Sequence, residues 1–199
     1  NKDILLLLGG PMGIRDIKYP RYNWLSNEIE LVKYCFSKHI PVLGICLGAQ
    51  LIAKAAGGDI VSMTSLDSSI KGEIGWAPIY PFDCSDSFTE KLFPFESLDV
   101  LHWHEDRIVL PSSSRLLAYS DKCREQMFAI GCNIYGLQFH PEVNDEMVEC
   151  WINEDKQFIE KAMGTLATSK LRSQQLAFSS KSFNRRYEFI RTLLSELIN

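Results

Sequence analysis

The sequence has no pair of cysteines at the spacing of a metal-binding or redox motif. Its six cysteines lie far apart, at Cys35, Cys46, Cys84, Cys123, Cys132 and Cys150. Cysteines scattered in this way argue against a framework of disulfide bonds and for a protein of a reducing compartment. We therefore expect a cytoplasmic protein.

The sequence also lacks an apolar run long enough to cross a bilayer. The longest run, around Ile4 to Leu8, has only the length of a strand, and no signal peptide is visible.

Basic residues are not in excess, since the sequence has 21 Lys and Arg against 25 Asp and Glu, for a net charge of −4. We expect neither a membrane nor a nucleic-acid partner. With 199 residues, 46% of them hydrophobic, the chain can form one domain with a sizeable core.

Residues 41–50 read Pro-Val-Leu-Gly-Ile-Cys-Leu-Gly-Ala-Gln. The apolar first half predicts a buried strand, and the glycines around Cys46 predict a sharp turn. A helix is expected from Leu47 through Ala56, ended by Gly57. A lone nucleophile between glycines at a strand-to-helix turn is typical of a nucleophile elbow, here with Cys in place of Ser. The first N–H groups of the helix can favour a thiolate and hold an oxyanion.

Histidine is scarce, so few residues can serve Cys46 as a base. The four candidates are His39, His102, His104 and His140. His140 follows a predicted strand at the rim where α/β sheets place ligands, and Glu142 is two residues further on. We predict a triad with Cys46 as nucleophile, His140 as general base and then acid, and Glu142 as the residue that orients the imidazole. The alternatives are a buried, inert Cys46 and a Glu142 that only favours a helix N-terminus.

Strands and helices alternate in the first half, which predicts a parallel α/β sheet. An apolar strand spans Ile4 to Leu8, and helical spacing follows from Leu25 to near Lys38. Further short strands are expected at 59–63, 73–80, 100–104, 115–120, 126–130 and 134–139. One helix is expected over 145–163 and an amphipathic helix closes the chain. The sequence allows two interpretations of the Ser- and Gln-rich stretch from Gly164 to Phe183, a helix or a partly mobile segment.

Three motifs in this order resemble the class I, or triad, glutamine amidotransferase family. They are Gly-Gly-Pro at 9–11, Gly-Ile-Cys-Leu-Gly-Ala-Gln at 44–50 and Gln-Phe-His-Pro-Glu at 138–142. The resemblance covers roughly Ile4 to Val148 and looks closest to stand-alone members similar to the amidotransferase part of GMP synthase.

The resemblance implies an α/β, flavodoxin-like, mostly parallel sheet flanked by helices, with the nucleophile elbow. It implies one amidotransferase-like domain over 1–199, in which 164–199 form a C-terminal helical extension. Relatives usually carry a strand-helix-strand lead before the Gly-Gly-Pro turn. That lead is absent here, so we expect a fragment or a shortened protein.

Substrate-binding residues are expected around Cys46. An oxyanion hole needs two donors, for which we expect the N–H of Leu47 and the Gly10 turn. In relatives the glutamine that matches Gln50 helps bind the amide end of the substrate; a solvent-facing glutamine is the alternative. His104 and Glu105 stand where relatives carry a Ser-His-Gly segment whose backbone holds the substrate, and Glu105 replaces that glycine.

Two histidines at i and i+2, His102 and His104, raise the question of a metal site. No carboxylate or third ligand is spaced for one, so we predict neither a metal nor a cofactor.

The resemblance implies a glutaminase. Cys46 would attack the side-chain carboxamide of glutamine, giving ammonia and a γ-glutamyl thioester that water releases as glutamate. The sequence has no ATP-binding loop, so any ammonia acceptor would come from a separate synthetase subunit. Two alternatives stay open. Many relatives carry a larger residue where Ala49 stands between the glycine and the glutamine of the motif, and a smaller residue there would widen the pocket. This departure and the one at Glu105 support a γ-glutamyl peptidase acting on γ-glutamyl peptides or conjugates. A non-catalytic binding or regulatory protein with the same fold is the other.

Overall fold

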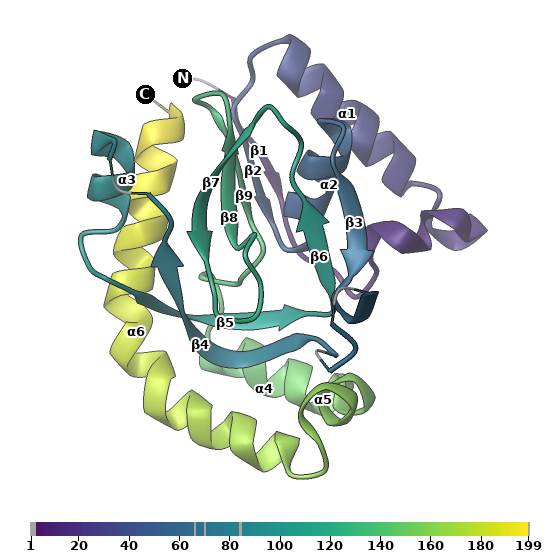
Figure 1. The fold of residues 1–199 in the computed structure, drawn as a ribbon, viewed down its shortest axis with the longest axis vertical. Coiled ribbons are helices and arrows are strands. Elements are labelled where there is room, and N and C mark those ends of the chain that lie inside the picture. The colour runs from purple at the N-terminus through teal and green to yellow at the C-terminus, as the bar shows by residue number, and fades with distance from the viewer. Residues whose placement is uncertain (1–2, 66, 70, 84, 199) are drawn as a thin grey trace.

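The computed structural model describes residues 3–65, 67–69, 71–83 and 85–198. Its main feature is a seven-stranded sheet (Figure 1). In spatial order the strands are β1 (Leu5–Leu7), β2 (Val42–Ile45), β9 (Ile134–Leu137), β8 (Met127–Ile130), β7 (Ser114–Tyr119), β4 (Glu73–Pro81) and β5 (Leu98–His104). A separate two-stranded sheet joins β3 (Asp59–Ser62) to β6 (Asp106–Val109).

The sheet is mixed, so the α/β fold class is confirmed while the expectation of a mostly parallel sheet is wrong. Parallel pairing joins β1 to β2 and β2 to β9, whereas the pairs further along the sheet are antiparallel. The cause is the length of the connections. A three-residue turn from Gly131 to Asn133 links β8 to β9, and so short a link allows only an antiparallel pair.

Helices cover both faces of the parallel part of the sheet. On one face lie α1 (Leu25–Ser37) and α2 (Leu47–Ala55), and short 3₁₀ turns at Ile14–Lys18 and Pro20–Tyr22 precede them. On the other face runs α6 (Ala167–Ile198), seen in Figure 1 as the long helix coloured light green to yellow. Its Phe189, Leu193 and Leu197 are buried in the same cluster as Leu43 of β2.

From Asp145 to Ile198 the chain forms three helices with short breaks between them. A break at Asp155 divides the predicted helix over 145–163 into α4 (Asp145–Glu154) and α5 (Lys156–Met163). The Asp155 carboxylate accepts a hydrogen bond of 2.9 Å from the indole of Trp103, which ties the break to β5. The stretch from Gly164 to Phe183 is not a mobile loop, because α6 runs through it from Ala167.

The remaining described elements are the short helix α3 (Ser87–Leu92) and a 3₁₀ turn at Met63–Ser65. No helix among the described residues is both long and apolar enough to span a membrane. Cys84, one of the six scattered cysteines, lies outside the described residues.

Candidate active site

The turn between β2 and α2 holds Cys46 in a strained conformation. Its φ of 52° and ψ of −105° are uncommon for a residue with a side chain. Close packing enforces the turn. A Cβ on Gly44 would lie 2.4 Å from the Gly48 carbonyl, and one on Gly48 would lie 2.3 Å from the Leu7 carbonyl oxygen. The two glycines therefore let α2 start directly against the sheet, which presents the Cys46 side chain at the end of the strand.

His140 and Glu142 lie in the segment after β9. The His140 N–H donates to the Leu101 carbonyl at 2.8 Å, which fixes this segment against β5. Its ring Nδ1 is 2.7 Å from Glu142 Oε1, and a Cβ on Gly9 would lie within 3.5 Å of both the His140 ring and Cys46 Cβ, which places the ring beside the nucleophile. The structure thus brings together the three residues predicted as a triad.

The charges around His140 favour its protonated form. Burial by itself would lower the pKa of His140, but the neighbouring Cys46 and Glu142 outweigh burial and raise that pKa to about 10. The ring is buried, while 27% of the Glu142 side chain is exposed. At neutral pH the imidazole therefore keeps a second proton that it can deliver to a leaving group.

The Gly-Gly-Pro turn lies against the same residues. A Cβ on Gly9 would come within 3.0 Å of His140 Cε1 and 3.5 Å of Cys46 Cβ, and one on Gly10 would come within 3.3 Å of Leu47 Cδ2. Leu47 is the first residue of α2, so its N–H is one of those that a helix leaves without an intrahelical acceptor. The predicted oxyanion donors are thus neighbours beside the nucleophile.

Two contacts of the Cys46 sulfur were not foreseen from the sequence. Gln138 Nε2 lies 3.7 Å from the sulfur, and the Trp103 carbonyl oxygen lies 4.0 Å from it. The Trp103 ring packs on Trp151 of α4, which in turn meets the His140 ring edge-on at 4.9 Å. Gln138 belongs to the motif around His140, whereas no sequence signal marks Trp151.

Gln50 of α2 is buried, with 4% of the residue exposed. The solvent-facing alternative for this residue is therefore excluded. Its side-chain Oε1 has no hydrogen-bond partner among the described residues. A buried acceptor without a donor is costly, and a bound substrate with N–H groups would relieve that cost.

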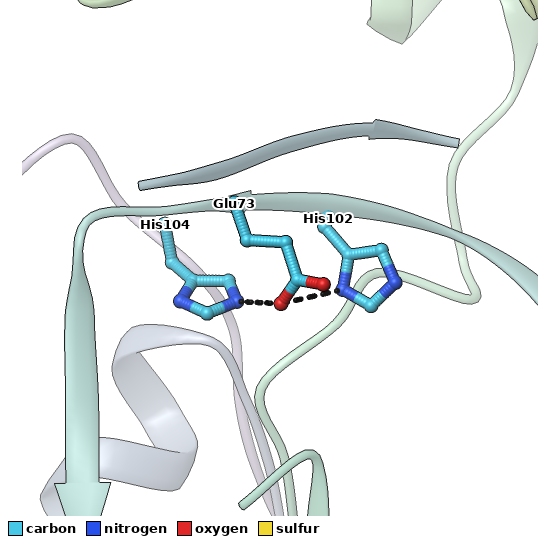
Figure 2. A group of neighbouring side chains, drawn as sticks. All are labelled: Glu73, His102 and His104. Atoms are coloured by element: carbon cyan, nitrogen blue, oxygen red, sulfur yellow. Dashed lines mark hydrogen bonds and ion pairs between the residues drawn. The ribbon is translucent and has the colours of Figure 1, made fainter. Parts of the chain in front are cut away.

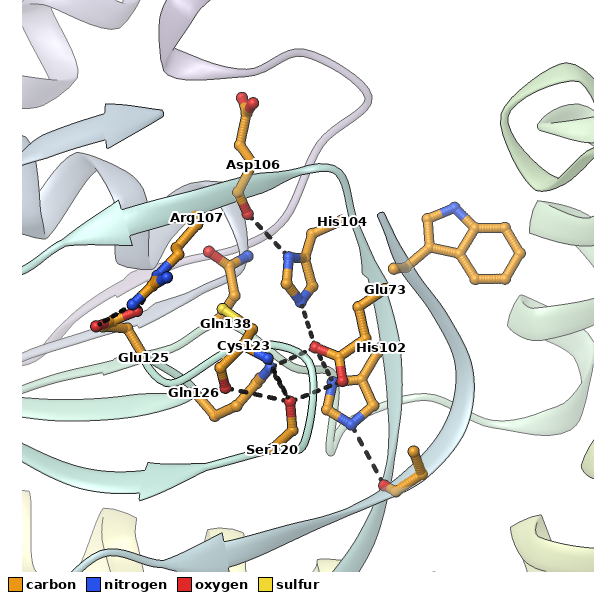
Figure 3. A network of polar contacts seen from close by, with 12 residues as sticks. Glu73, His102, His104, Asp106, Arg107, Ser120, Cys123, Glu125, Gln126 and Gln138 are labelled. Carbon is orange, nitrogen blue, oxygen red and sulfur yellow. Dashed lines mark hydrogen bonds and ion pairs between the residues drawn. The ribbon is translucent and has the colours of Figure 1, made fainter. Parts of the chain in front are cut away.

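The His104 side chain points into a buried polar network (Figures 2 and 3). The antiparallel register of β4 and β5 sets Glu73 opposite His104. Glu73 Oε2 lies 3.2 Å from His104 Nε2 and 3.5 Å from His102 Nδ1. The carboxylate also accepts from Ser120 and Gln126, at 2.7 and 2.6 Å.

At the centre of the network lies the buried Glu73 carboxylate, which accepts hydrogen bonds from several side chains. Burial alone would raise the pKa of Glu73, but His102, His104 and Ser120 outweigh it and lower that pKa to about 2. Burial lowers the pKa of His102 to about 4. Glu73 is therefore ionised and His102 neutral at pH 7.

Pairing of β4 with β5 thus supplies a carboxylate that the sequence pattern did not predict for the two histidines. Glu73, His102 and His104 could each offer one metal-ligand atom, all within 4.8 Å of one another. The carboxylate is already used by Ser120 and Gln126, and three ligands fall short of a closed four-ligand site. Its contacts therefore describe a structural network that fixes the residues on either side of Trp103.

The described contacts of Glu105 are with α5 and with the turn at Met63. Its exposed side chain forms an ion pair with Lys161 of α5 at 2.8 Å, and its carbonyl accepts the Met63 N–H at 3.0 Å. The side chain and the carbonyl of Glu105 are therefore both engaged by other parts of the chain.

Comparison with known proteins gives one consistent result. The family model for glutamine amidotransferase class-I matches residues 1–150. The chain is 34% identical over 161 residues to a subunit of the glutamine-hydrolysing GMP synthase of Picrophilus torridus, covering 80% of this chain and 76% of that protein. It is 30% identical over 164 residues to a glutamine amidotransferase-like protein of Salmonella typhimurium, covering 81% of this chain and 66% of that protein.

Two further likenesses add to this result. Identity to γ-glutamyl peptidase 3 of Arabidopsis thaliana is 29% over 160 residues, covering 74% of this chain and 62% of that protein. A crystal structure of a glutamine amidotransferase from Thermotoga maritima superposes with a TM-score of 0.78 at 29% identity, covering 98% of this chain and 78% of that one. The chain thus spans slightly less than two thirds of the length of some of its curated relatives.

Proposed function

Because this chain belongs to the class I glutamine amidotransferase family, we propose that it hydrolyses the side-chain amide of glutamine to glutamate and ammonia. The observation that carries the proposal is the arrangement of Cys46, His140 and Glu142 at the nucleophile elbow, with a 2.7 Å contact between His140 and Glu142. The curated relatives include proteins named glutamine-hydrolysing, which supports the choice of substrate.

The first half of the reaction forms a thioester. The Cys46 sulfur attacks the side-chain carbonyl carbon, and the thiol proton resides on His140, whose raised pKa favours the imidazolium. The N–H groups of Leu47 and Gly10 hold the oxyanion of the tetrahedral intermediate. His140 then gives its proton to the amide nitrogen, the carbon–nitrogen bond breaks, and ammonia leaves.

The second half releases the product. Neutral His140 takes a proton from water, and the resulting hydroxide attacks the thioester carbon. The carbon–sulfur bond breaks, glutamate leaves, and His140 returns its proton to the sulfur. Glu142 holds the Nδ1 side of the ring throughout, so that the other nitrogen serves the reacting atoms. In total one glutamine and one water give one glutamate and one ammonia.

Substrate binding rests on groups beside the nucleophile. The unpartnered Oε1 of buried Gln50 is available to accept from a substrate N–H group. The proposed acceptor for the ammonia is a separate synthetase chain, since several relatives are named as single subunits of GMP synthase.

A γ-glutamyl peptidase is the second candidate. It is favoured by the likeness to a plant γ-glutamyl peptidase. It is also favoured by the Trp151 ring next to His140 and the Trp103 ring packed on Trp151, where an amine larger than ammonia would leave. The chemistry at Cys46 is the same, and only the leaving group differs.

One experiment separates the candidates. The purified protein is incubated with glutamine and, in parallel, with a panel of γ-glutamyl dipeptides, and the products are identified by mass spectrometry. Preferred release of ammonia from glutamine supports the glutaminase. Faster release of amino acids from the dipeptides favours the peptidase. No product from any substrate, with no labelling of Cys46 by a thiol-reactive glutamine analogue, returns the chain to a non-catalytic binding protein.

A further inference from the structure

A buried arginine from the C-terminal helix holds the segment that carries His140 and Glu142. Arg186 of α6 is only 2% exposed. Its Nη1 donates to two main-chain carbonyls, that of Pro141 at 2.9 Å and that of Val143 at 2.8 Å. These carbonyls belong to the residues directly before and after Glu142. One guanidinium group therefore fixes the backbone on both sides of that carboxylate.

The arginine itself is held in place by its own helix and by β4. Its Nε donates to Ser182 Oγ at 3.1 Å, one helical turn earlier. The guanidinium also lies over the Trp76 ring, 4.9 Å from the ring centre. Burial lowers the pKa of Arg186, while Asp145 and Glu142 oppose this shift, and an arginine stays charged in proteins. A buried cation with this many donors in use is pre-organised rather than adaptable.

The opposite side of the same segment is fixed by the main chain. The His140 N–H donates to Leu101 of β5, whereas Pro141 has no N–H with which to hold itself. The segment between β9 and α4 is thus held at His140 by the sheet and at Glu142 by α6. Loosening the second attachment would free the carboxylate that orients the imidazole.

We propose that Arg186 is a positioning residue for the hydrolysis. It acts through Glu142, by fixing the Pro141 and Val143 carbonyls so that Glu142 meets His140 Nδ1 at hydrogen-bond distance. The inference rests on the proposed function. It lies outside residues 1–150, the part matched by the family model, and it gives α6 a part in the chemistry besides closing the core.

The test compares two neighbouring arginines of α6. Arg186→Met keeps an unbranched apolar stem but removes the donors and the charge, whereas Arg186→Lys keeps the charge with fewer donors. Arg185→Met is the matched control, because Arg185 is exposed and lies over Phe95 on the outer surface. Each variant is first checked for folding by circular dichroism. Active sites are then counted by alkylation of Cys46, and kcat and KM are measured on the substrate that the wild-type protein turns over.

A positioning role predicts a loss in kcat per titrated site with little change in KM. We expect Arg186→Met to lose roughly 10- to 100-fold in kcat, as geometric misplacement of a catalytic group can cost about 100-fold. Arg186→Lys should recover part of the loss, and Arg185→Met should match the wild type. A purely structural arginine would instead lower the melting temperature and leave kcat per active site unchanged.

Several outcomes overturn the proposal. They are wild-type kcat in folded Arg186→Met, equal losses in Arg186→Met and Arg185→Met, or, if Arg186→Met does not fold, wild-type kcat in folded Arg186→Lys. Absence of turnover in the wild-type protein would count against the proposed function instead. In that case the rate of Cys46 alkylation still tests Arg186, because a His140 ring that Glu142 no longer orients slows it in Arg186→Lys but not in Arg185→Met.

Discussion

His140 Nδ1 lies 2.7 Å from Glu142 Oε1, with only Pro141 between the two residues in the chain. In a regular strand the side chains of residues i and i+2 share a face but stand roughly 6.6 Å apart along the strand, and in a helix they point to different sides. Here the segment leaves the sheet after β9, and the ring and the carboxylate meet. The contact sets which ring nitrogen is left for Cys46, because a ring nitrogen engaged by a carboxylate is not available to a second partner.

The reactivity of the thiols should single out Cys46. Burial raises the pKa of Cys35, and burial together with the charge of Glu73 raises that of Cys123 to about 12, so both resist ionisation. Cys46 has a histidine beside it and a helix N-terminus behind it. Limiting iodoacetamide at pH 7.5, followed by peptide mass spectrometry, should modify Cys46 first. First modification at Cys123 would contradict the assignment.

Substitutions in the triad should rank in a fixed order. Cys46→Ala should abolish turnover, because no other residue forms the thioester, and His140→Ala should be nearly as severe, since nucleophile and base act as a unit. Glu142→Ala should be milder, because His140 remains in place but is poorly oriented. Steady-state kinetics on the preferred substrate give the ranking. A Glu142→Ala loss equal to that of Cys46→Ala would mean that the carboxylate does more than orient the ring.

Turnover should persist into alkaline solution and then fall. The pKa of His140 is raised from about 6.5 to about 10, so the imidazolium that protonates the leaving nitrogen is lost only as the pH rises through about 10. The same proton also stabilises the folded state, and this contribution to the free energy of unfolding falls as the pH rises. It is complete below the unfolded-state pKa of about 6.5 and is lost as the pH approaches 10. A profile of kcat from pH 6 to 11 measures the pH at which activity falls. A fall centred near pH 7 would contradict the raised pKa of His140.

Removal of the Gln50 side-chain amide should weaken binding more than chemistry. Gln50→Leu keeps the volume of a buried residue but removes the unpartnered Oε1. We expect KM to rise by roughly 5- to 30-fold, the range for one lost hydrogen bond of about 1–2 kcal/mol to a polar ligand, with kcat changed less. Gln175→Leu on α6 is a control amide away from Cys46. An unchanged KM in Gln50→Leu would remove this residue from the binding site.

The Glu73 network should stabilise the fold at neutral pH. The pKa of Glu73 is lowered from about 4.5 to about 2, so its contribution is present above pH 4.5 and is lost as the pH falls through 2. A shift of this size corresponds to about 3 kcal/mol. Glu73→Gln should therefore be less stable than the wild type in urea unfolding at pH 7, and the gap should narrow at pH 3. A gap independent of pH would place the stabilisation in packing instead of charge.

Much of the site follows from short stretches of sequence. A Cys between Gly44 and Gly48 implies a sharp turn, because only residues without a Cβ allow α2 to lie against the Leu7 strand. A His and an acid two residues apart after a strand imply a second catalytic pair at the same rim. These are local constraints, and local sequence is enough to express them.

Tertiary structure decided what depends on distant pairing. Three features join residues that are far apart in the chain. They are the antiparallel part of the sheet, the contacts of Glu73 with the two histidines across β4 and β5, and the hydrogen bonds of Arg186 to the segment around Glu142. The family resemblance placed the backbone of His104 beside the substrate, and it did not predict where the imidazole ring lies. Strand register turned the ring towards a carboxylate 31 residues away, since a buried charge is stable only where enough donors converge on it.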